Sequence, residues 1–387
     1  MIANVTPSFD VLERDMLKRL DNGHDADLLN FVPLSRKNTR GRGAQSNRSG
    51  RFEKFQREIF NDGWASNEAE SNSDTVEHME RATSIITRNS SPDLHFDRSI
   101  NPYRGCAHGC SYCYARPTHT YLGHSAGIDF ERDIYIKPNA ADLLRSELSR
   151  PRYRAKTIAI GTNTDPYQPV ERKHKIMRQL LEVFCETRHP VMITTKSALI
   201  LRDLDLLEKL ARQNLVFVTM SITSMDHRLS RWMEPRASTP VKRLEAIKIL
   251  SDAGIITNVL TAPMIPAIND MELEKIIENS AAQGAVGARM IMLRLPLEVL
   301  DIFREWLLCH YPNRVSHVMN LVRDMRNGKE NDSRFGWRMR GQGPYAQMLE
   351  QRFELIVEKL GLNNRPPVLR RDLFEPPKST SSQLSLF

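Results

Sequence analysis

The sequence predicts an α/β fold with a parallel sheet, because short apolar runs alternate with amphipathic helices over much of the chain. Five runs rich in apolar and β-branched residues have the length of buried strands. Between them, apolar residues recur three or four positions apart, which is the helical pattern. Strands and helices in alternation form parallel sheets with crossover helices. The predicted strands are Thr157–Ile160, Val191–Thr195, Val216–Ile222, Ile255–Leu260 and Met290–Leu295.

The predicted helices lie in the gaps between these strands. With a further strand expected just before Cys106, they give about six strand–helix units. Gly254 is expected to end the helix before the fourth run, and Asp270 to cap the helix that follows it. The apolar rows of the helices are Ile176-Leu180-Phe184, Leu204-Leu207-Leu210, Leu244-Ile247-Leu250 and Ile276-Ile277.

An N-terminal extension, residues 1–90, is expected to be separate from this α/β core, residues 91–300. A basic run rich in glycine and serine occupies residues 36–51, and an acidic, serine-rich run follows at 67–74. Such composition cannot bury a core, so we expect the extension to be largely disordered. The alternative is an arm that contacts phosphates, and its candidate residues are Arg40, Arg42 and Arg48.

Two further regions are expected after the core. Residues 301–376 read as a helical C-terminal addition, and one apolar stripe should pack on the core. Residues 377–387 read as a flexible tail after a proline-rich turn. The stripe consists of Tyr345, Leu349, Phe353, Ile356 and Leu360.

Composition indicates a globular protein of a reducing compartment. The chain has 387 residues, of which 40% are hydrophobic, so it can bury a sizeable core. It has no apolar run of membrane-spanning length and no basic-then-apolar secretion signal at its start, so we expect a cytoplasmic protein without membrane contact. Five cysteines, three of them clustered, argue against a disulfide framework. The net charge of +8 is compatible with nucleic acid but does not establish it.

A cysteine motif carries the strongest functional signal. Cys106, Cys110 and Cys113 have the spacing Cys-x3-Cys-x2-Cys, with an aromatic residue just before the last cysteine. Three thiolates can hold three irons of a cubane 4Fe–4S cluster and leave the fourth iron open, whereas a closed cluster takes four. A structural zinc site is the alternative, with His119 or His124 as a fourth ligand.

This motif resembles the signature of the radical S-adenosylmethionine (SAM) family. The resemblance implies a 4Fe–4S cluster whose open iron binds the amino and carboxylate groups of SAM. It implies an enzyme in which one electron, from a donor such as flavodoxin or ferredoxin, cleaves SAM to a 5′-deoxyadenosyl radical that abstracts a hydrogen atom. Radical SAM cores adopt a partial (β/α)6 barrel, which agrees with about six units. Sites in such barrels lie at the C-terminal ends of the strands.

The core from about 95 to 300 resembles the spore photoproduct lyase-like, "DNA repair photolyase" branch of that family. The run Thr-Asn-Thr-Asp-Pro-Tyr-Gln-Pro after the strand Thr157–Ile160 narrows the resemblance to a bacterial subgroup. Carried over by position, the resemblance implies a set of SAM contacts. Tyr112 would lie against the adenine, Thr164 and Lys196 would hold the ribose and the carboxylate, and Ser221 and Ala262 would complete the pocket. Weaker candidates are Met220, Thr223, Pro263 and Arg294.

The sequence departs from spore photoproduct lyases at the tip of this strand. Those enzymes carry a hydrogen-donating cysteine there, and this chain has Thr162. A threonine O–H bond is too strong to replace a thiol, so reversal of a thymine lesion by that route is in doubt. Tyr103, Tyr114 or Tyr167 could donate instead, and the sequence does not select among them.

Two segments outside the core hint at nucleic acid. The last five residues resemble the peptide by which bacterial replication and repair proteins dock on the β sliding clamp. The segment from Arg334 to Pro344 combines arginine with aromatic residues, a mixture that suits contacts with phosphates and bases. The alternative is a loop whose aromatic residues cover the barrel. The clamp-like residues are Gln383, Leu384, Ser385, Leu386 and Phe387.

The sequence therefore predicts a radical SAM enzyme that acts on damaged or modified DNA. The alternatives are radical SAM modification of RNA or a peptide, and a non-catalytic, DNA-associated iron–sulfur protein. The sequence identifies no catalytic residue beyond the cofactor-binding set.

Overall fold

The computed structural model describes residues 41–53, 74–363 and 365–377. Contacts divide the chain into residues 1–38, none of which is described, and a second unit of residues 39–387. The disorder expected for residues 1–40 and 54–73 therefore concerns a part of the chain outside the described residues. Among the described helices, none is long and apolar enough to cross a membrane.

A seven-stranded sheet forms the centre of the second unit, in the order β10-β9-β8-β7-β6-β3-β2. Six neighbouring strands are parallel, and β2 is antiparallel to β3 at one edge. Six parallel strands with connecting helices confirm the predicted partial (β/α)6 barrel. The strands are β2 (Ile86–Arg88), β3 (Arg98–Ile100), β6 (Ile158–Ile160), β7 (Val191–Thr195), β8 (Val216–Ser221), β9 (Ile256–Met264) and β10 (Gly287–Met292).

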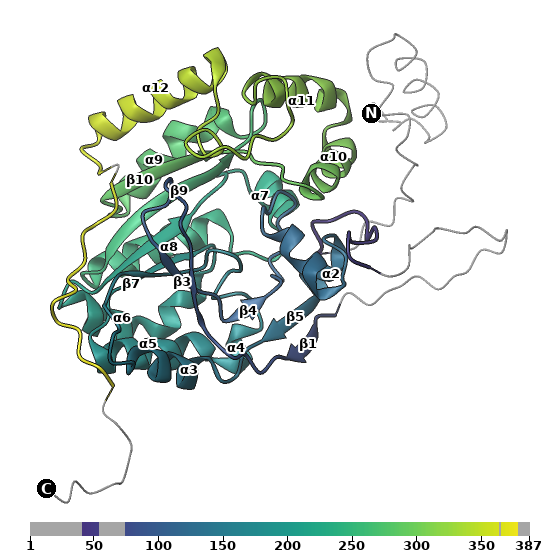
Figure 1. Cartoon of the computed structure of the whole chain (residues 1–387). Helices are drawn as coiled ribbons and strands as arrows, with labels where there is room; N and C mark the ends of the chain where they lie inside the picture. Colours follow the sequence, from purple (N-terminus) through teal and green to yellow (C-terminus); the bar gives the residue numbers. More distant parts are fainter. Residues whose placement is uncertain (1–40, 54–73, 364, 378–387) are drawn as a thin grey trace, which may run out of the picture. The chain divides into compact units, whose positions relative to one another are not determined.

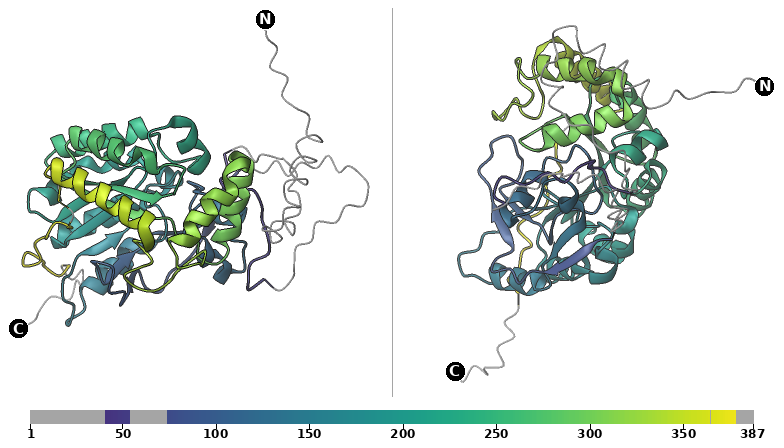
Figure 2. Two further views of the ribbon diagram at one scale, coloured as in Figure 1. Left: turned by 90° about the horizontal axis from the view of Figure 1, so that it is seen from above. Right: turned by 90° about the vertical axis from the view of Figure 1, so that its right-hand side faces the viewer.

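Helices lie along the outer side of this sheet, as Figures 1 and 2 show. The apolar rows predicted from the sequence face the strands: Leu180 and Leu207, for example, are fully buried in the main core. The helices of this layer are α3 (Ala140–Leu148), α4 (Glu171–His174), α5 (Ile176–Thr187), α6 (Leu204–Ala211), α8 (Pro240–Asp252) and α9 (Leu273–Ala282), with short 3-10 helices η3 (Ala198–Asp203) and η4 (Asp270–Glu272). Helix α7 (His227–Met233) lies instead beside the cysteine motif, where the Ser111 amide donates to the Met233 carbonyl at 3.0 Å.

Helix ends test the two predicted caps. Gly254 follows the end of α8 with φ of +77°, which is the left-handed conformation that glycine adopts after a helix, so that prediction is confirmed. The prediction for Asp270 is wrong. A 3-10 turn begins at Asp270, and the N-cap of α9 is Glu272. The Asp270 carboxylate instead accepts a hydrogen bond from the Tyr345 hydroxyl.

A three-stranded sheet lies beside the barrel, in the order β1-β5-β4. Its middle strand is parallel to β1 and antiparallel to β4. The cysteine motif follows β4 directly, so this sheet places the motif beside the barrel strands. The elements are β1 (Val76–Met79), β4 (Tyr103–Arg104), β5 (Asp133–Ile136), η2 (Arg116–Leu122) and α2 (Ile128–Arg132).

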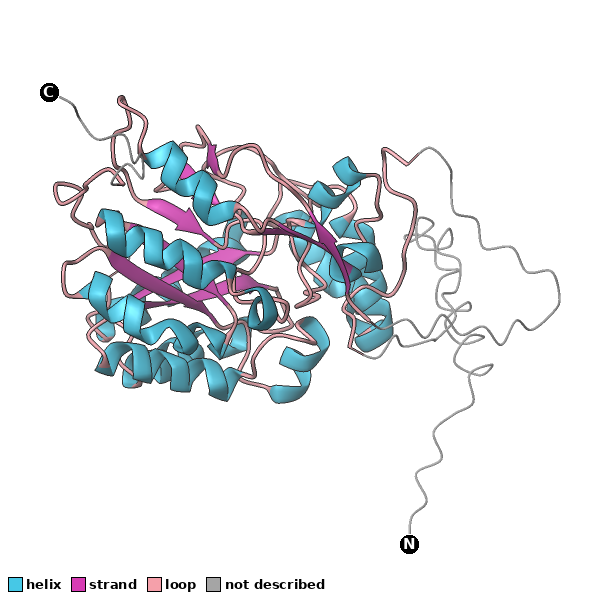
Figure 3. Cartoon of the chain, turned by 90° about the horizontal axis from the view of Figure 1, so that it is seen from below, coloured by secondary structure: helices cyan, strands magenta, loops and turns pink. Residues whose placement is uncertain are grey.

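The C-terminal region contains α10 (Val299–His310), η5 (Pro312–Arg314), α11 (Val315–Asp324) and α12 (Gly343–Lys359). Helix α12 packs against α9 and β10 (Figure 1). Its predicted stripe faces the barrel: Leu349 and Ile356 are buried, and Tyr345, Phe353 and Leu360 pack against the core. Figure 3 separates these helices from the strands by colour.

Residues 41–53, here called the N-terminal strap, belong to the compact unit although the sequence places them in the extension. Ala44 is fully buried with Ala126 and Ile302. Arg42 is also buried and donates a hydrogen bond to the Glu131 carbonyl at 2.7 Å. Arg48 forms an ion pair with Glu305 at 3.0 Å. Arg42 is therefore a structural residue rather than part of a solvated arm.

Candidate functional site

The cysteine motif forms a tight loop, here called the cluster loop (residues 105–114). Two turns shape it, in which the Gly109 amide donates to the Cys106 carbonyl at 3.3 Å and the Cys113 amide to the Cys110 carbonyl at 3.2 Å. Gly109 has φ of +68°, and a Cβ there would stand 2.6 Å from the Glu131 carboxylate. Glycine is therefore required for the loop to close against its neighbours.

The three cysteines of the loop are largely enclosed. Cys106 and Cys110 are buried, and Cys113 packs with Cys106 against Ala115 and Phe130. Burial raises the pKa of all three thiols, that of Cys106 to about 12, and neighbouring thiols add to the effect at Cys106 and Cys110. Three thiols in so dry a place would gain their anionic form on binding a metal centre, since a bound metal displaces the proton.

The arrangement of donors fits a multi-iron group better than a single ion. Within the described residues, no three His, Cys, Asp or Glu side chains converge on a position that one metal ion could occupy. A cubane spreads its ligands over separate irons, so it needs no such convergence. No fourth cysteine completes the loop: Cys185 contacts the Leu206 carbonyl on the helical layer, and Cys309 is exposed on α10.

The two histidines of the zinc alternative lie in another cluster. His119 is buried between Phe130 and His124, with ring centroids 5.6 and 5.2 Å away. Burial lowers the pKa of His119 to about 4, and His124 adds to the effect. The His124 Nε2 atom lies 2.7 Å from the Tyr135 hydroxyl.

A fully buried ion pair contacts the backbone of the cluster loop. Arg116 and Glu131 are fully buried and pair at 2.5 Å. The Arg116 Nε atom donates to the Cys110 carbonyl at 2.9 Å, so the pair is tied to the backbone of the motif. Removing one partner of such a pair costs several kcal/mol, because the other charge stays buried.

The same carboxylate attaches the N-terminal strap to the loop. Glu131 accepts hydrogen bonds from the backbone amides of Gly43 at 2.9 Å and Ala44 at 2.8 Å. A Cβ on Gly43 would stand 1.7 Å from the Gly109 carbonyl oxygen, so the two backbones touch. The strap therefore covers the cluster loop through glycine and backbone contacts.

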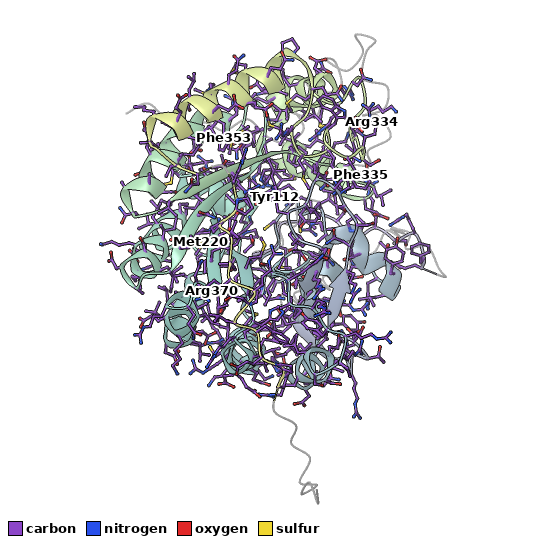
Figure 4. The ribbon with its side chains drawn as sticks, turned by 60° about the vertical axis from the view of Figure 1, so that its left-hand side comes forward. Tyr112, Met220, Arg334, Phe335, Phe353 and Arg370 are labelled. Atoms are coloured by element: carbon purple, nitrogen blue, oxygen red, sulfur yellow. The ribbon has the colours of Figure 1, made fainter. Side chains whose placement is uncertain are left out.

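Four of the five residues that the resemblance assigns to SAM lie together: Tyr112 in the cluster loop, and Lys196, Ser221 and Ala262 at the C-terminal ends of neighbouring strands. Lys196 donates to the Ser221 hydroxyl at 2.6 Å, and Ser221 lies 3.5 Å from the Ala262 carbonyl. The Lys196 ammonium stands 5.9 Å from the centroid of the Tyr112 ring. Burial raises the pKa of Cys110 and Cys113, and the nearby Lys196 charge acts in the opposite direction. Figure 4 shows Tyr112 near the middle of the view.

The fifth residue, Thr164, joins this group from the loop after β6. Its hydroxyl donates to the Gly105 carbonyl at 2.6 Å, next to Cys106. Gln168 donates to Thr164 at 3.0 Å and accepts from the Ala107 amide at 2.8 Å. The residue after Thr164, Asp165, accepts from the Lys196 amide at 2.7 Å. The polar loop after β6 therefore connects the cluster loop with Lys196.

Sequence reasoning missed Glu234, the carboxylate beneath these residues. It accepts hydrogen bonds from the Tyr112 and Thr223 hydroxyls and from Arg243, and lies 3.6 Å from Lys196. Burial alone would raise its pKa, yet the charges of Arg243 and Lys196 and the two hydroxyls hold it at about 2. Glu234 follows helix α7 and carries no motif, so no pattern in the sequence pointed to it.

The weaker candidates divide between the pocket and its rim. Thr223 bonds to Glu234, whereas Met220 is fully buried on β8. The Pro263 carbonyl accepts from the Asn269 side chain at 3.0 Å. The Arg294 guanidinium lies over the Tyr114 ring, 5.5 Å from its centroid.

The structure separates the three tyrosines proposed as hydrogen donors. Tyr103 and Tyr167 are almost completely buried, and the Tyr103 hydroxyl donates to Glu171. Tyr114 directly follows Cys113, is 49% exposed, and its hydroxyl donates to the Thr162 carbonyl at the tip of β6. Of the three, Tyr114 alone stands both beside the cysteines and in contact with solvent.

Comparison with known proteins identifies the family of this chain. The model of the radical SAM superfamily matches residues 100–279. An uncharacterised protein of Mycobacterium tuberculosis (strain ATCC 25618 / H37Rv) is 38% identical over 282 residues, which cover 70% of this chain and 78% of that protein. One of Methanocaldococcus jannaschii is 30% identical over 173 residues, covering 45% of this chain and 62% of that protein.

The fold is similar to that of solved structures of spore photoproduct lyase. The complex of that enzyme with dinucleoside spore photoproduct has a TM-score of 0.55 and 17% identity, and the match covers 74% of this chain and 80% of the lyase. The family model, the relatives and the barrel lead to one assignment. This chain belongs to the radical SAM superfamily and is a radical SAM enzyme.

Proposed function

We propose that this radical SAM enzyme acts on a damaged or modified base of DNA. In this proposal Cys106, Cys110 and Cys113 hold a 4Fe–4S cluster, and SAM binds beside it. When bound, the two cofactors supply a 5′-deoxyadenosyl radical. The observation that carries the proposal is the position of Lys196, which links the candidate SAM pocket to the cluster loop through Ser221, Tyr112 and the two nearby thiols.

The chain's own residues would orient SAM and keep water away. Lys196 offers a cation for the SAM carboxylate, since a carboxylate in a water-poor site needs a positive partner. Tyr112 offers an aromatic face for the adenine, and Ser221 and the Ala262 carbonyl offer hydrogen bonds. Thr164 stands on the cluster side of the pocket and offers its hydroxyl to the ribose. Glu234 fixes Tyr112 and balances the charge of Lys196.

The DNA assignment is supported by two further observations. The net charge of +8 favours a polyanionic substrate. The solved lyase whose fold this chain shares was crystallised with a dinucleoside spore photoproduct. We further propose that Tyr114 replaces the missing cysteine as hydrogen donor, since its hydroxyl bonds to Thr162 at the same strand tip.

The decisive experiment incubates anaerobically reconstituted, reduced protein with SAM and with irradiated or chemically modified DNA. Formation of 5′-deoxyadenosine together with a changed base, and transfer of deuterium between the two, would support the proposal. A Cys110→Ala variant should be inactive, whereas Cys185→Ala, a cysteine of the helical layer, should remain active. 5′-Deoxyadenosine that forms only with RNA or a peptide would contradict the DNA assignment, and its complete absence would indicate a non-catalytic iron–sulfur protein.

The proposal extends to the compartment and the protein partners of the enzyme. The five cysteines without a disulfide suit a reducing compartment, so we expect the enzyme to work in the cytoplasm with flavodoxin or ferredoxin as electron donor. The clamp-like residues Gln383–Phe387 lie outside the described residues, and clamp docking remains a proposal.

A further inference from the structure

A loop after α11, residues 334–340, reaches the rim of the barrel mouth. Successive turns shape it, in which the Arg338 amide donates to the Arg334 carbonyl at 3.0 Å and Gly341 to Trp337 at 2.8 Å. The Met292 amide, at the C-terminal end of β10, donates to the Met339 carbonyl at 2.9 Å. That end of the strand faces the candidate site, so the loop stands beside the site rather than behind the barrel.

The loop exposes aromatic rings next to arginines. Phe335 is 54% exposed and Trp337 is 48% exposed. The Arg338 guanidinium lies over the Phe335 ring, 4.8 Å from its centroid, just as Arg294 lies over Tyr114. Figure 4 labels Phe335 and Arg334 on the outer side of the view relative to Tyr112. Exposed rings in a group mark a binding surface more often than scattered ones do.

The arginine charges join the loop to the residue beside the cysteines. The Arg294 guanidinium lies over the Tyr114 ring and also contacts the sulfur of Met339, the residue after Arg338, so it joins the loop to Tyr114. Arg338 is fixed by two hydrogen bonds to Asp93, at 2.6 and 2.5 Å. The rings and cations therefore form one surface from the cluster loop to the rim.

Arg294 is the unsatisfied member of this surface. Among the described residues, no carboxylate forms an ion pair with it, and its Nε atom has no hydrogen-bond partner. Its Nη1 atom makes a weak contact with the Met339 sulfur at 3.7 Å. Asp93, an acid whose charge acts on Arg294, already pairs with Arg338. A half-buried guanidinium with no ion pair of its own costs free energy unless an anion arrives. Its position over Tyr114 places that anion beside the reacting end of the site.

We infer that Tyr114, Arg294, Phe335, Trp337 and Arg338, here called the arginine–aromatic platform, bind an unpaired stretch of DNA. The inference rests on the proposed function and names the surface that delivers its substrate. Exposed rings stack on bases irrespective of sequence, and Arg338, paired with Asp93, supports the Phe335 ring. Arg294 takes the phosphate next to the base that enters the mouth. An enzyme that acts on a base must receive it out of the duplex, so single-stranded DNA is the expected partner.

Fluorescence anisotropy with a labelled single-stranded oligonucleotide tests the platform without any chemistry. The full-length, anaerobically reconstituted protein is compared with a Phe335→Ala/Trp337→Ala variant and with Arg294→Gln. The double variant should weaken binding at least about fivefold per ring removed. Arg294→Gln should weaken binding and reduce the slope of log K against log salt by about 1.

Two matched controls keep the test specific. Tyr121→Ala removes a ring that is 69% exposed on η2, and Arg152→Gln removes an exposed charge before β6, at the other end of the barrel strands. Both should bind DNA within about twofold of the unmodified protein. The Phe335→Ala/Trp337→Ala variant and both controls should still cleave SAM when reduced, which shows that their cofactor site is intact.

The outcomes separate this inference from the proposed function. If the platform variants bind DNA as tightly as the controls do, the inferred binding surface is wrong, even if DNA is the substrate. Tighter binding of an RNA of equal sequence, or of an acidic peptide, would also overturn it. If the platform variants lose DNA binding but no DNA base is ever altered, the surface stands and the proposed chemistry fails.

Discussion

At the scale of single residues, Glu234 interacts with four side chains of the candidate site, although no sequence motif marks it. It is buried with Arg243 and close to Lys196, and it holds the hydroxyls of Tyr112 and Thr223. The residues proposed to contact SAM could be carried over by resemblance because they follow strands or lie among the cysteines. Glu234 could not be predicted in this way, because its role depends on a balance of charges that exists only in the folded chain.

Replacing Glu234 by Gln should lower the free energy of unfolding by about 3 kcal/mol or more, because Arg243 stays buried without its acid. The surface variant Glu245→Gln, which loses an exposed pair with Lys242, should cost less than about 1 kcal/mol. Urea denaturation of the anaerobic protein at neutral pH measures both values. Equal effects of the two substitutions would show that Glu234 contributes no more than a surface pair.

The lowered pKa of Glu234 also predicts how stability depends on pH. The pKa is about 2 in the folded protein and about 4.5 for an ordinary glutamate, so folding favours the ionised carboxylate. This stabilisation is fully present above about pH 4.5 and is lost as the pH falls towards 2. Denaturation midpoints of the unmodified protein and of Glu234→Gln should therefore converge below pH 4. A gap that stays constant from pH 7 to 3 would contradict the assignment.

Tyr114 offers the sharpest test of the reaction. A Tyr114→Phe variant keeps the ring over which Arg294 lies and loses only the hydroxyl. We expect DNA binding and SAM cleavage to persist within about twofold, and formation of the repaired or modified base to fall at least tenfold. Tyr121→Phe, an exposed tyrosine of η2, is the control. Normal product formation by Tyr114→Phe would remove the tyrosine from the reaction.

At the scale of elements, the sequence predicts helices and strands far better than it predicts the N-terminal strap that covers the cluster loop. Val191–Thr195 and Ile176–Phe184 form the strand and helix that their apolar periodicity indicates, because burial of one face fixes both. The N-terminal strap has almost no apolar residues, so composition assigned it to a disordered extension. Its burial depends on glycine contacts and on amides that Glu131 satisfies, which no periodicity reveals.

The strap is testable through Gly43. A Gly43→Ala change forces a Cβ into the Gly109 carbonyl oxygen, so the strap must leave the cluster loop. We expect a lower iron content after anaerobic reconstitution and faster loss of the brown colour in air. Gly328→Ala, where a Cβ meets open space and only the left-handed φ of +78° is strained, should retain iron at the unmodified level. Full cluster retention by Gly43→Ala would mean that the strap does not protect the loop.

At the scale of the whole molecule, the last described segment runs across the face opposite to the site. Residues 363–375 bond to positions that precede the strands: Asn363 to Val286, Arg370 to Asn214 and Glu375 to Thr187. Phe374 packs between Tyr153 and His189, with ring centroids 5.4 Å away in both cases. The chain is therefore anchored at the N-terminal ends of the strands, whereas the cysteines and Lys196 stand at the C-terminal ends.

We expect the anchor at Phe374 to keep a clamp bound to the C-terminal motif away from the barrel mouth. Gln383 follows Phe374 by nine positions, which span at most about 30 Å of extended chain. A clamp bound there can approach the barrel from the opposite face and leave the mouth open to DNA. Truncation before Gln383 should abolish binding to purified β sliding clamp and leave SAM cleavage and oligonucleotide binding unchanged, because no described core residue is removed.

Substitution of Leu384, Leu386 and Phe387 by alanine should have the same effect as truncation, since these side chains are the apolar anchors of the motif. A Ser385→Ala variant is the matched control and should bind the clamp normally. The unmodified protein should bind clamp and single-stranded DNA at the same time, which a ternary gel-filtration experiment detects. If clamp and DNA exclude one another, the motif does not use the opposite face, and the arrangement inferred from the Phe374 anchor is wrong.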